Sequence, residues 1–301
     1  MTRWLGRTAF VLVTARSDTM AAPERASLDL DIKLPIAHLM LDPTCLRFLQ
    51  TFGKPLGWEG VVLFWLDIDR LRAQPSHAQL LRLCEVVWNV YFQPNAELDI
   101  RRYVPKALRQ AVAVRLREED ITPYLFDDIQ DDLWCNAMQD LYQMFLKSSQ
   151  YSQLIEHLVT TICAHATRGD QGMLLMKDTD CFQNPVGVQL LRSYLKTIKQ
   201  AHLLDFCLSV ITLQKRVTSP AQLMDDATTL IKQYIHPLGK HNLVTNPKMQ
   251  KKIASRLVSP SSDMFEEAFV EVKELICAEL IPQWLQSEHY AERFDKIERW
   301  M

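Results

Sequence analysis

The sequence is poor in features that mark β-sheet proteins, nucleotide-binding enzymes and membrane proteins. It has only 8 glycines in 301 residues, and no Asn-Gly or Asp-Gly turn joins two β-branched runs. Neither common glycine-rich phosphate loop, GxGxxG or GxxxxGK[ST], is present. No apolar run approaches the roughly 18–20 residues that a membrane span needs. These absences argue against a hairpin-rich fold, a nucleotide-binding enzyme and a membrane-spanning chain.

Charge and cysteine usage narrow the function classes further. The net charge of −2 gives no overall attraction to nucleic acid, and we expect no nucleic-acid partner. The seven cysteines form no CxxC pair and no disulfide spacing. They lie among apolar neighbours, so we expect buried free thiols in a reducing compartment, most simply the cytoplasm. The histidines show no metal-site spacing, and we expect no metal and no cofactor.

The most informative feature that is present is an internal repeat. Residues 126–151 read FDDIQDDLWCNAMQDLYQMFLKSSQY, and residues 265–290, which begin 139 residues later, read FEEAFVEVKELICAELIPQWLQSEHY. Both copies carry an apolar residue at every fourth position. Each step of four residues rotates the apolar position by roughly 40° around a helix, so these side chains could not all face one core from a single straight helix. We expect two helices to meet near 140–143 and near 279–282, where Pro282 suits a first helical turn.

Helical periodicity also dominates the rest of the chain. Apolar residues recur at three- and four-residue intervals in segments 79–93, 105–119, 129–150, 152–166, 187–214, 221–235 and 247–257. Clusters of Pro, Gly and Ser separate these segments. We therefore predict an all-α protein with two tandem helical bundle domains. The expected organisation is a flexible N-terminal tail (1–28), a first domain (29–153), a connecting helix and linker that contains RGDQG (154–173), a second domain (174–292) and a C-terminal tail (293–301).

The first 25 residues leave an alternative open. They contain four arginines and no acidic residue before Asp18, which is the composition of a mitochondrial-type targeting segment. A flexible tail, or translation that begins at Met20, is the simpler interpretation.

The repeated residues resemble the regulator of G-protein signalling (RGS) family. The family pattern runs FL…EN-(apolar)-x-FW, then NLD, then FDEAQ…DSY-x-x-FLKS-x-x-Y. The first repeat offers Phe48-Leu49, Leu63-Phe64-Trp65, Leu98-Asp99, Phe126-Asp127-Asp128-Ile129-Gln130 and Phe145-Leu146-Lys147-Ser148. The second offers Tyr194-Leu195, Asp205-Phe206, Asn242-Leu243, Phe265-Glu266-Glu267-Ala268 and Trp284-Leu285-Gln286-Ser287. The resemblance covers roughly residues 34–152 and 174–292 and implies two tandem RGS-like domains.

The resemblance also implies a partner and a mechanism. Members of the family bind the switch segments of a Gα subunit in their transition-state arrangement and so accelerate GTP hydrolysis. They supply no arginine finger, because Gα holds its arginine in cis. The family's contact surface uses a Glu-Asn pair before the FW strip, the Asn of NLD, and an Asp and an Arg that lie four residues apart before FLKS.

Several of these contact residues are replaced here. The Glu-Asn pair falls on Gly60-Val61 in the first repeat and on His202-Leu203 in the second. The Asn corresponds to Glu97 and Asn242, the acid to Asp140 and Glu279, and the Arg to Met144 and Gln283. The second repeat therefore keeps more of the surface. The candidate Gα contacts are Asn242, Glu279, His202, Gln283, Asp140 and Glu97.

The expected function is a non-enzymatic interaction module in heterotrimeric G-protein signalling, which binds Gα and accelerates its GTP hydrolysis weakly through the second domain. The alternative is a degenerate RGS scaffold or adaptor that binds other proteins or anionic membrane without GTPase-activating activity. Lys248, Lys251, Lys252 and Arg256 form a basic strip that would meet anionic lipid at the inner face of the plasma membrane. A solvated helix face is the simpler interpretation of that strip.

Two other clusters have structural interpretations. Asp127, Asp128, Asp131 and Asp132 lack the order of a calcium loop, and acids in a first helical turn are favoured by the helix dipole. Cys163 and His165, two residues apart on a helix, point away from each other, and the sequence places no acid to orient the histidine. We predict no catalytic residues.

Overall fold

The computed structural model describes residues 32–72, 76–169, 174–215, 220–244 and 246–300. The described elements are helices, apart from one short antiparallel pair of β1 (Thr167–Arg168) and β2 (Leu174–Leu175). The prediction of an all-α fold is confirmed. The expected N-terminal tail, with its arginine-rich stretch, lies outside the described residues.

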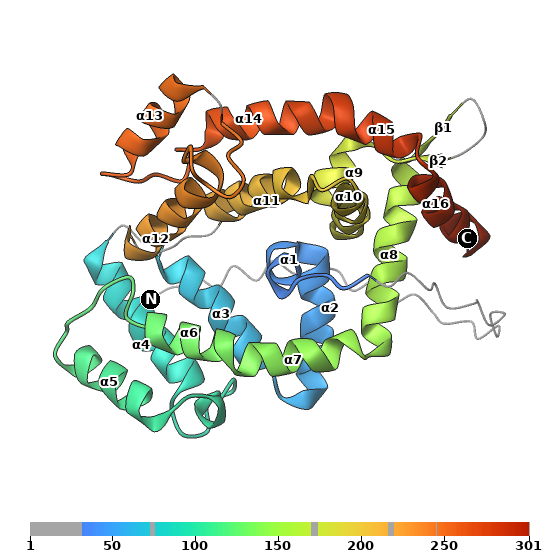
Figure 1. Cartoon of the computed structure of the whole chain (residues 1–301). Coiled ribbons are helices and arrows are strands. Elements are labelled where there is room, and N and C mark those ends of the chain that lie inside the picture. Colours follow the sequence, from blue (N-terminus) through green and yellow to red (C-terminus); the bar gives the residue numbers. More distant parts are fainter. Residues whose placement is uncertain (1–31, 73–75, 170–173, 216–219, 245, 301) are drawn as a thin grey trace, which may run out of the picture.

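The first repeat is a bundle of short helices. Its elements are α1 (Ile36–Leu41), α2 (Pro43–Gly53), η1 (Lys54–Leu56), α3 (Glu59–Arg72), α4 (His77–Tyr91), η2 (Arg101–Tyr103), α5 (Lys106–Arg117), α6 (Asp127–Cys135) and α7 (Ala137–Leu146). The long helix α8 (Ser149–His165) then leads from the first repeat to the second along one side of the molecule (Figure 1).

The second repeat has a similar order of elements. They are α9 (Asp178–Gln183), α10 (Pro185–Thr197), α11 (Ala201–Lys215), α12 (Pro220–Leu230), η3 (Ile231–Ile235), α13 (Pro247–Arg256), α14 (Glu266–Leu275), η4 (Ile276–Leu280), α15 (Ile281–Leu285) and α16 (Glu288–Trp300). Two of them, η3 and η4, are single π-helical turns.

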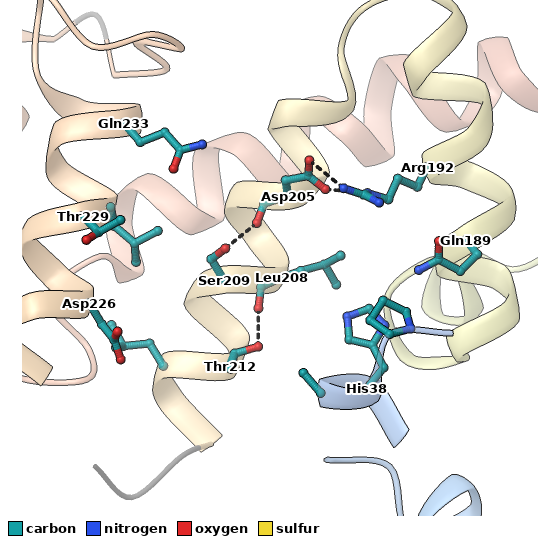
Figure 2. A pocket seen from close by; sticks show the side chains of 14 residues that line it. His38, Gln189, Arg192, Asp205, Leu208, Ser209, Thr212, Asp226, Thr229 and Gln233 are labelled. Atoms are coloured by element: carbon teal, nitrogen blue, oxygen red, sulfur yellow. Dashed lines mark hydrogen bonds and ion pairs between the residues drawn. The ribbon is translucent and has the colours of Figure 1, made fainter. Parts of the chain in front are cut away.

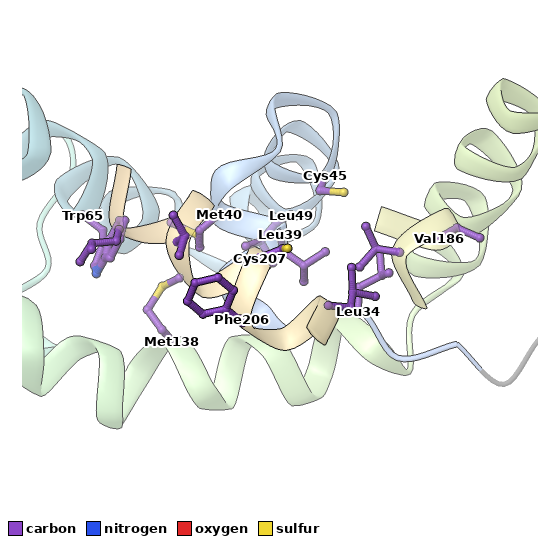
Figure 3. Close-up of a cluster of buried hydrophobic side chains, with 14 of the residues drawn as sticks. Leu34, Leu39, Met40, Cys45, Leu49, Trp65, Met138, Val186, Phe206 and Cys207 are labelled. Carbon is purple, nitrogen blue, oxygen red and sulfur yellow. The ribbon is translucent and has the colours of Figure 1, made fainter. Parts of the chain in front are cut away.

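The buried apolar side chains form one connected cluster that includes both repeats. Figure 3 shows part of it, with Met138 of the first repeat near Phe206 of the second, and Leu34 of the first repeat on the side of Val186. The aromatic cores of the two repeats correspond. Phe64 meets Tyr91 and Phe126 in the first, and Phe206 meets Tyr234 and Phe265 in the second. The shared pattern of large rings is therefore a packing requirement of the fold.

Helices α3 and α6–α7 pack antiparallel in the first repeat. Arg72, at the end of α3, pairs with Asp127 at the start of α6 at 2.7 Å. Further along, the amide of Gln130 donates to the carbonyl of Trp65 at 3.2 Å. The end of α2 also approaches α7, since a Cβ built on Gly53 would lie 3.7 Å from Leu141.

The tyrosine that ends the RGS pattern fixes the first residues of each repeat through two hydrogen bonds. Tyr151 donates to the carbonyl of Ile32 at 2.8 Å and accepts from the amide of Leu34 at 2.9 Å. The hydroxyl of Tyr290 bonds the carbonyl of Leu174 and the amide of Met176 in the same way, both at 2.8 Å. Burial raises the pKa of Tyr151 to about 12 and also raises that of Tyr290, so both hydroxyls remain protonated.

The expected helix junction is wrong in the first copy. The break lies at Asn136, between α6 and α7, rather than at 140–143. In the second copy the corresponding position is the π-helical turn η4, and α15 begins at Ile281, within the expected range. The continuous segment expected over 187–214 is also two helices, because Lys199 adopts a left-handed φ of 61° between α10 and α11.

The C-terminal tail expected over 293–301 is also wrong as a description of residues 293–300. They continue α16, and Tyr290, Phe294 and Ile297 are buried along one face of that helix. The spacing of four and three residues between these side chains keeps them on one stripe, so the helix packs on the second repeat.

Candidate functional site

The residues that the RGS pattern selects in the second repeat come from three segments. His202 lies in the first turn of α11, Asn242 lies in the loop between η3 and α13, and Glu279 and Gln283 lie on η4 and α15. We call these four residues the second-repeat face. The turn before His202 is tight: the amide of Gln200 donates to the carbonyl of Leu195 at 2.7 Å.

A histidine stack holds the first two segments together. The ring of His202 lies on the ring of His241, with centroids 4.7 Å apart and an interplanar angle of 12°. The loop of His241 is anchored on η3, because the amide of His241 donates to Gln233 and that of Leu243 donates to Tyr234. Asn242 is therefore presented, exposed, directly beside the stack, and its side-chain oxygen accepts from Gln250 at 3.4 Å.

The third segment lies at the same end of the bundle. Gln214, near the end of α11, donates to Glu266 at the start of α14 at 2.6 Å, so these helices run antiparallel. From Gln214 back to His202 and from Glu266 on to Glu279 the helical rise is about 18–20 Å in each case. His202 and Glu279 therefore lie at similar heights along the helix pair. Glu279 and Gln283 are both exposed, and no hydrogen bond joins either side chain to another described residue.

The corresponding residues of the first repeat are Gly60, Glu97, Asp140 and Met144, which we call the first-repeat face. Glu97 and Asp140 are exposed. A Cβ on Gly60 would lie 2.6 Å from the carbonyl oxygen of Leu98, so α3 approaches the chain after Glu97 too closely for a side chain there. Met144, where the family has arginine, is 40% exposed. This face therefore offers an apolar side chain where the RGS pattern has a cation.

Burial favours the neutral form of His202. Burial and the neighbouring His241 lower the pKa of His202 below its ordinary value of 6.5, although Asp205 acts in the opposite direction. Asp205 itself is held by Arg192 in two contacts, at 2.7 and 3.1 Å. At neutral pH the partly buried ring of His202 is thus uncharged.

A cavity of ≈ 500 Å³ lies behind this pair, between α1 and helices α10–α12. Figure 2 shows the Arg192–Asp205 pair on one wall and His38, from the first repeat, near Gln189. Burial and Arg192 lower the pKa of His38. The described residues contain no group of three or more metal-binding side chains, and the cavity offers no nucleophile with an adjacent base.

Two side-chain contacts of histidines are not predicted by the sequence. The partner of His202 is His241, which no motif selects, because the two rings meet only after the η3 loop folds back. His165 also has an acidic partner, contrary to expectation: its Nδ1 lies 3.1 Å from buried Asp180. That pair joins the end of α8 to α9, and no signal in the sequence spacing reveals it.

The basic strip on α13 is partly neutralised. Lys252 pairs with Glu267 at 2.5 Å and Arg256 pairs with Asp263 at 2.8 Å, whereas Lys248 and Lys251 are exposed. Asp127, of the acidic cluster in α6, pairs with Arg72. Within the described ranges, no helix is both long enough and apolar enough to cross a bilayer.

Comparison with known proteins decides the family. The model for the regulator of G protein signaling domain matches residues 36–154 and 179–293, which together make up more than three quarters of the chain. The chain belongs to the RGS family. Its two matches agree with the twofold repeat and with the all-α fold.

An individual relative within the RGS family is also similar to this chain. The mouse (Mus musculus) protein Regulator of G-protein signaling 13 is 25% identical over 95 residues, which cover 32% of this chain and 58% of that protein. The chain thus spans less than two thirds of the length of this relative. Membership of the family assigns the chain a role in the regulation of G-protein signalling.

Proposed function

We propose that the second repeat binds a Gα subunit in the transition state of its GTP hydrolysis and accelerates that hydrolysis weakly. The observation that carries the proposal is the stack of His202 on His241, which places exposed Asn242 beside the turn that the family uses for contact. An interaction that stabilises the switch segments in their transition-state arrangement lowers the barrier, since it is stronger there than in the ground state.

The proposed roles differ among the four residues. The side-chain amide of Asn242 can donate to Gα, because its oxygen already accepts from Gln250. Glu279 supplies an acceptor at the position where the family has an acid. Gln283 offers a neutral amide in place of the family's arginine, and His202 offers a neutral ring in place of the Glu-Asn pair. Replacement of two charged or hydrogen-bonded contacts typically costs several kcal/mol of binding free energy, which is why we expect weak acceleration.

We further propose that the first repeat makes no productive Gα contact. Its face combines Glu97 for asparagine, Met144 for arginine and Gly60-Val61 for the Glu-Asn pair. The close approach of Gly60 to Leu98 leaves no room for a larger residue at that position. The first repeat would then support the second through their common core.

A single-turnover GTP hydrolysis assay with a panel of Gα subunits tests the proposal. We expect a modest rate increase with the wild-type chain and a loss of most of that increase on Asn242→Ala. Glu97→Ala, at the corresponding position of the first repeat, is the matched control and should leave the rate unchanged. The adaptor function would be favoured by a different pair of results. The chain would accelerate no Gα, and a pulldown would recover other partners but no GDP–aluminium fluoride-bound Gα.

A further inference from the structure

Lysines gather around the second-repeat face. Lys196 and Lys199 lie at the α10–α11 turn, Lys232 lies on η3, and Lys240 precedes His241 in the following loop. All four side chains are exposed, and none forms an ion pair with another described residue. They differ in this respect from Lys252 and Arg256 on α13, which are paired with acids.

Contacts between the segments hold these lysines on one surface. The amide of Lys199 donates to the carbonyl of Lys196 at 3.1 Å, which closes the turn next to His202. His202 stacks on His241, directly after Lys240. The loop then approaches η3, since a Cβ on Gly239 would lie 2.8 Å from the carbonyl oxygen of Lys232. The four lysines therefore lie in segments whose backbones meet next to the histidine stack.

Few negative charges compensate these lysines. Asp205 is neutralised by Arg192 within the bundle. His202 adds no charge near neutral pH, because burial and the neighbouring His241 lower its pKa. Glu279 contributes one negative charge to the second-repeat face. Four lysines against this carboxylate leave a positive surplus.

The first-repeat face has the opposite character. Glu97 and Asp140 are exposed and form no ion pair with a described residue. Lys54 is paired with Glu59, and Arg101 is paired with Asp99. Arg102 lies over the ring of Tyr103 and donates to the carbonyl of Gly57. A partner that fits the second-repeat face electrostatically therefore meets like charge or apolar surface on the first.

We propose that the second repeat selects Gα subunits whose switch surface carries a surplus of Asp and Glu, and that Lys196, Lys199, Lys232 and Lys240 accelerate their association. This inference rests on the function proposed above. Long-range attraction between opposite charges raises the association rate by about ten- to a thousandfold at low salt and affects dissociation less. Because salt screens exposed charges, the attraction weakens strongly when the ionic strength rises to about 0.5 M.

Stopped-flow association of the full chain with GDP–aluminium fluoride-bound Gα tests the proposal, at ionic strengths from about 20 to about 500 mM. We expect the wild-type association rate to fall by at least about tenfold across this range. Lys199→Glu combined with Lys240→Glu should lower the low-salt rate by about tenfold or more and flatten its salt dependence. The control, Lys106→Glu with Lys296→Glu, changes the net charge equally at exposed sites on α5 and α16 and should leave the rate nearly unchanged.

Each other outcome counts against the proposal in a distinct way. Gα binding with a salt-independent association rate, or an equal loss in both double variants, overturns the charge-selection inference and leaves the proposed function intact. No binding to any Gα overturns both. If vesicles that contain about 30% phosphatidylserine bind the wild type but not the Lys199/Lys240 variant, while Gα binding is the same for both, the lysines serve a membrane instead.

Discussion

Tyr151 and Tyr290 make equivalent hydrogen bonds in the two repeats. Each hydroxyl donates to one backbone carbonyl and accepts from a backbone amide two residues later, at 2.8–2.9 Å. The segments bonded in this way precede the first helices of each repeat. One side chain near the end of a repeat thus fixes the start of the same repeat.

Removal of either hydroxyl should destabilise the chain. Tyr151→Phe and Tyr290→Phe each leave a buried amide and a buried carbonyl without a partner, which costs about 1–3 kcal/mol of unfolding free energy. Urea denaturation followed by circular dichroism measures the change. Tyr124→Phe, whose hydroxyl bonds no other described residue, is the control and should shift the midpoint little. Equal midpoints for all three variants would contradict the tyrosine tether.

The buried arginine of α3 should matter far more than its exposed neighbour. The side chain of Arg72 is 5% exposed and binds Asp69 and Asp127, whereas that of Arg70 is 79% exposed and binds Asp67. Arg72→Met removes the cation that pairs with Asp127 and the donor that bonds the side-chain oxygen of Gln130, and should cost about 3–5 kcal/mol. Arg70→Met should cost less than about 1 kcal/mol. Comparison of the two urea midpoints measures the contrast, and similar losses would refute it.

Two glycines in the first repeat should respond differently to alanine. Gly60→Ala places a Cβ 2.6 Å from the carbonyl oxygen of Leu98, so backbone must move, at a cost of about 1–3 kcal/mol. In Gly53→Ala the new Cβ meets Trp58 Cβ at 3.3 Å and Leu141 at 3.7 Å, while the helix gains up to about 1 kcal/mol. Thermal melting of both variants measures the difference. A larger loss of thermal stability for Gly53→Ala than for Gly60→Ala would contradict the close approach of Gly60 to Leu98.

Acidification should destabilise the second repeat through His202. Its folded-state pKa lies below 6.5, chiefly because the ring is buried and secondarily because of His241, so the unfolded chain binds the proton more tightly. The stabilising contribution is therefore complete above pH 6.5 and is lost as the pH falls below it. We expect His202→Gln to lose less stability than the wild type between about pH 7.5 and about pH 5.5. His38 and His289, whose pKa values are also lowered, remain in both proteins and contribute equally.

Nuclear magnetic resonance titration of the histidine ring protons isolates the same effect. The midpoint of His202 should lie below 6.5 and rise when His241→Gln removes the neighbouring imidazole that lowers its pKa. A midpoint at or above 6.5 would show that the stack is open in solution.

The repeat and the helical periodicity predict the fold class, because they record which side chains must be buried. Helix junctions are harder to predict. Pro282 marks the junction in the second copy, but no proline or glycine accompanies Asn136 in the first, where packing of α6 and α7 on α3 decides the position. A π-helical turn such as η4 leaves no residue signature, since only its hydrogen-bond pattern differs.

The residues of the candidate site are likewise only partly predictable from the sequence. A family pattern selects Asn242, Glu279 and His202 because they occupy aligned positions in the chain. It does not select His241 or the lysines around the second-repeat face, because these meet only when the η3 loop folds back. The charge difference between the two faces likewise depends on which ion pairs form, such as Arg192 with Asp205, and this requires the structure.

Helix α8 belongs to both repeats. Tyr151 at its start completes the first core, while the carbonyl of Leu158 in its middle accepts from Asn184 at the start of α10, and His165 at its end meets Asp180. A first-repeat fragment that ends before α8 lacks Tyr151 and its hydrogen bonds. A second-repeat fragment that begins after α8 lacks the contacts of Leu158 and His165 with α9 and α10. The repeats, although related in sequence, are thus expected to melt as one cooperative unit, and a functional fragment would need to retain the whole pair.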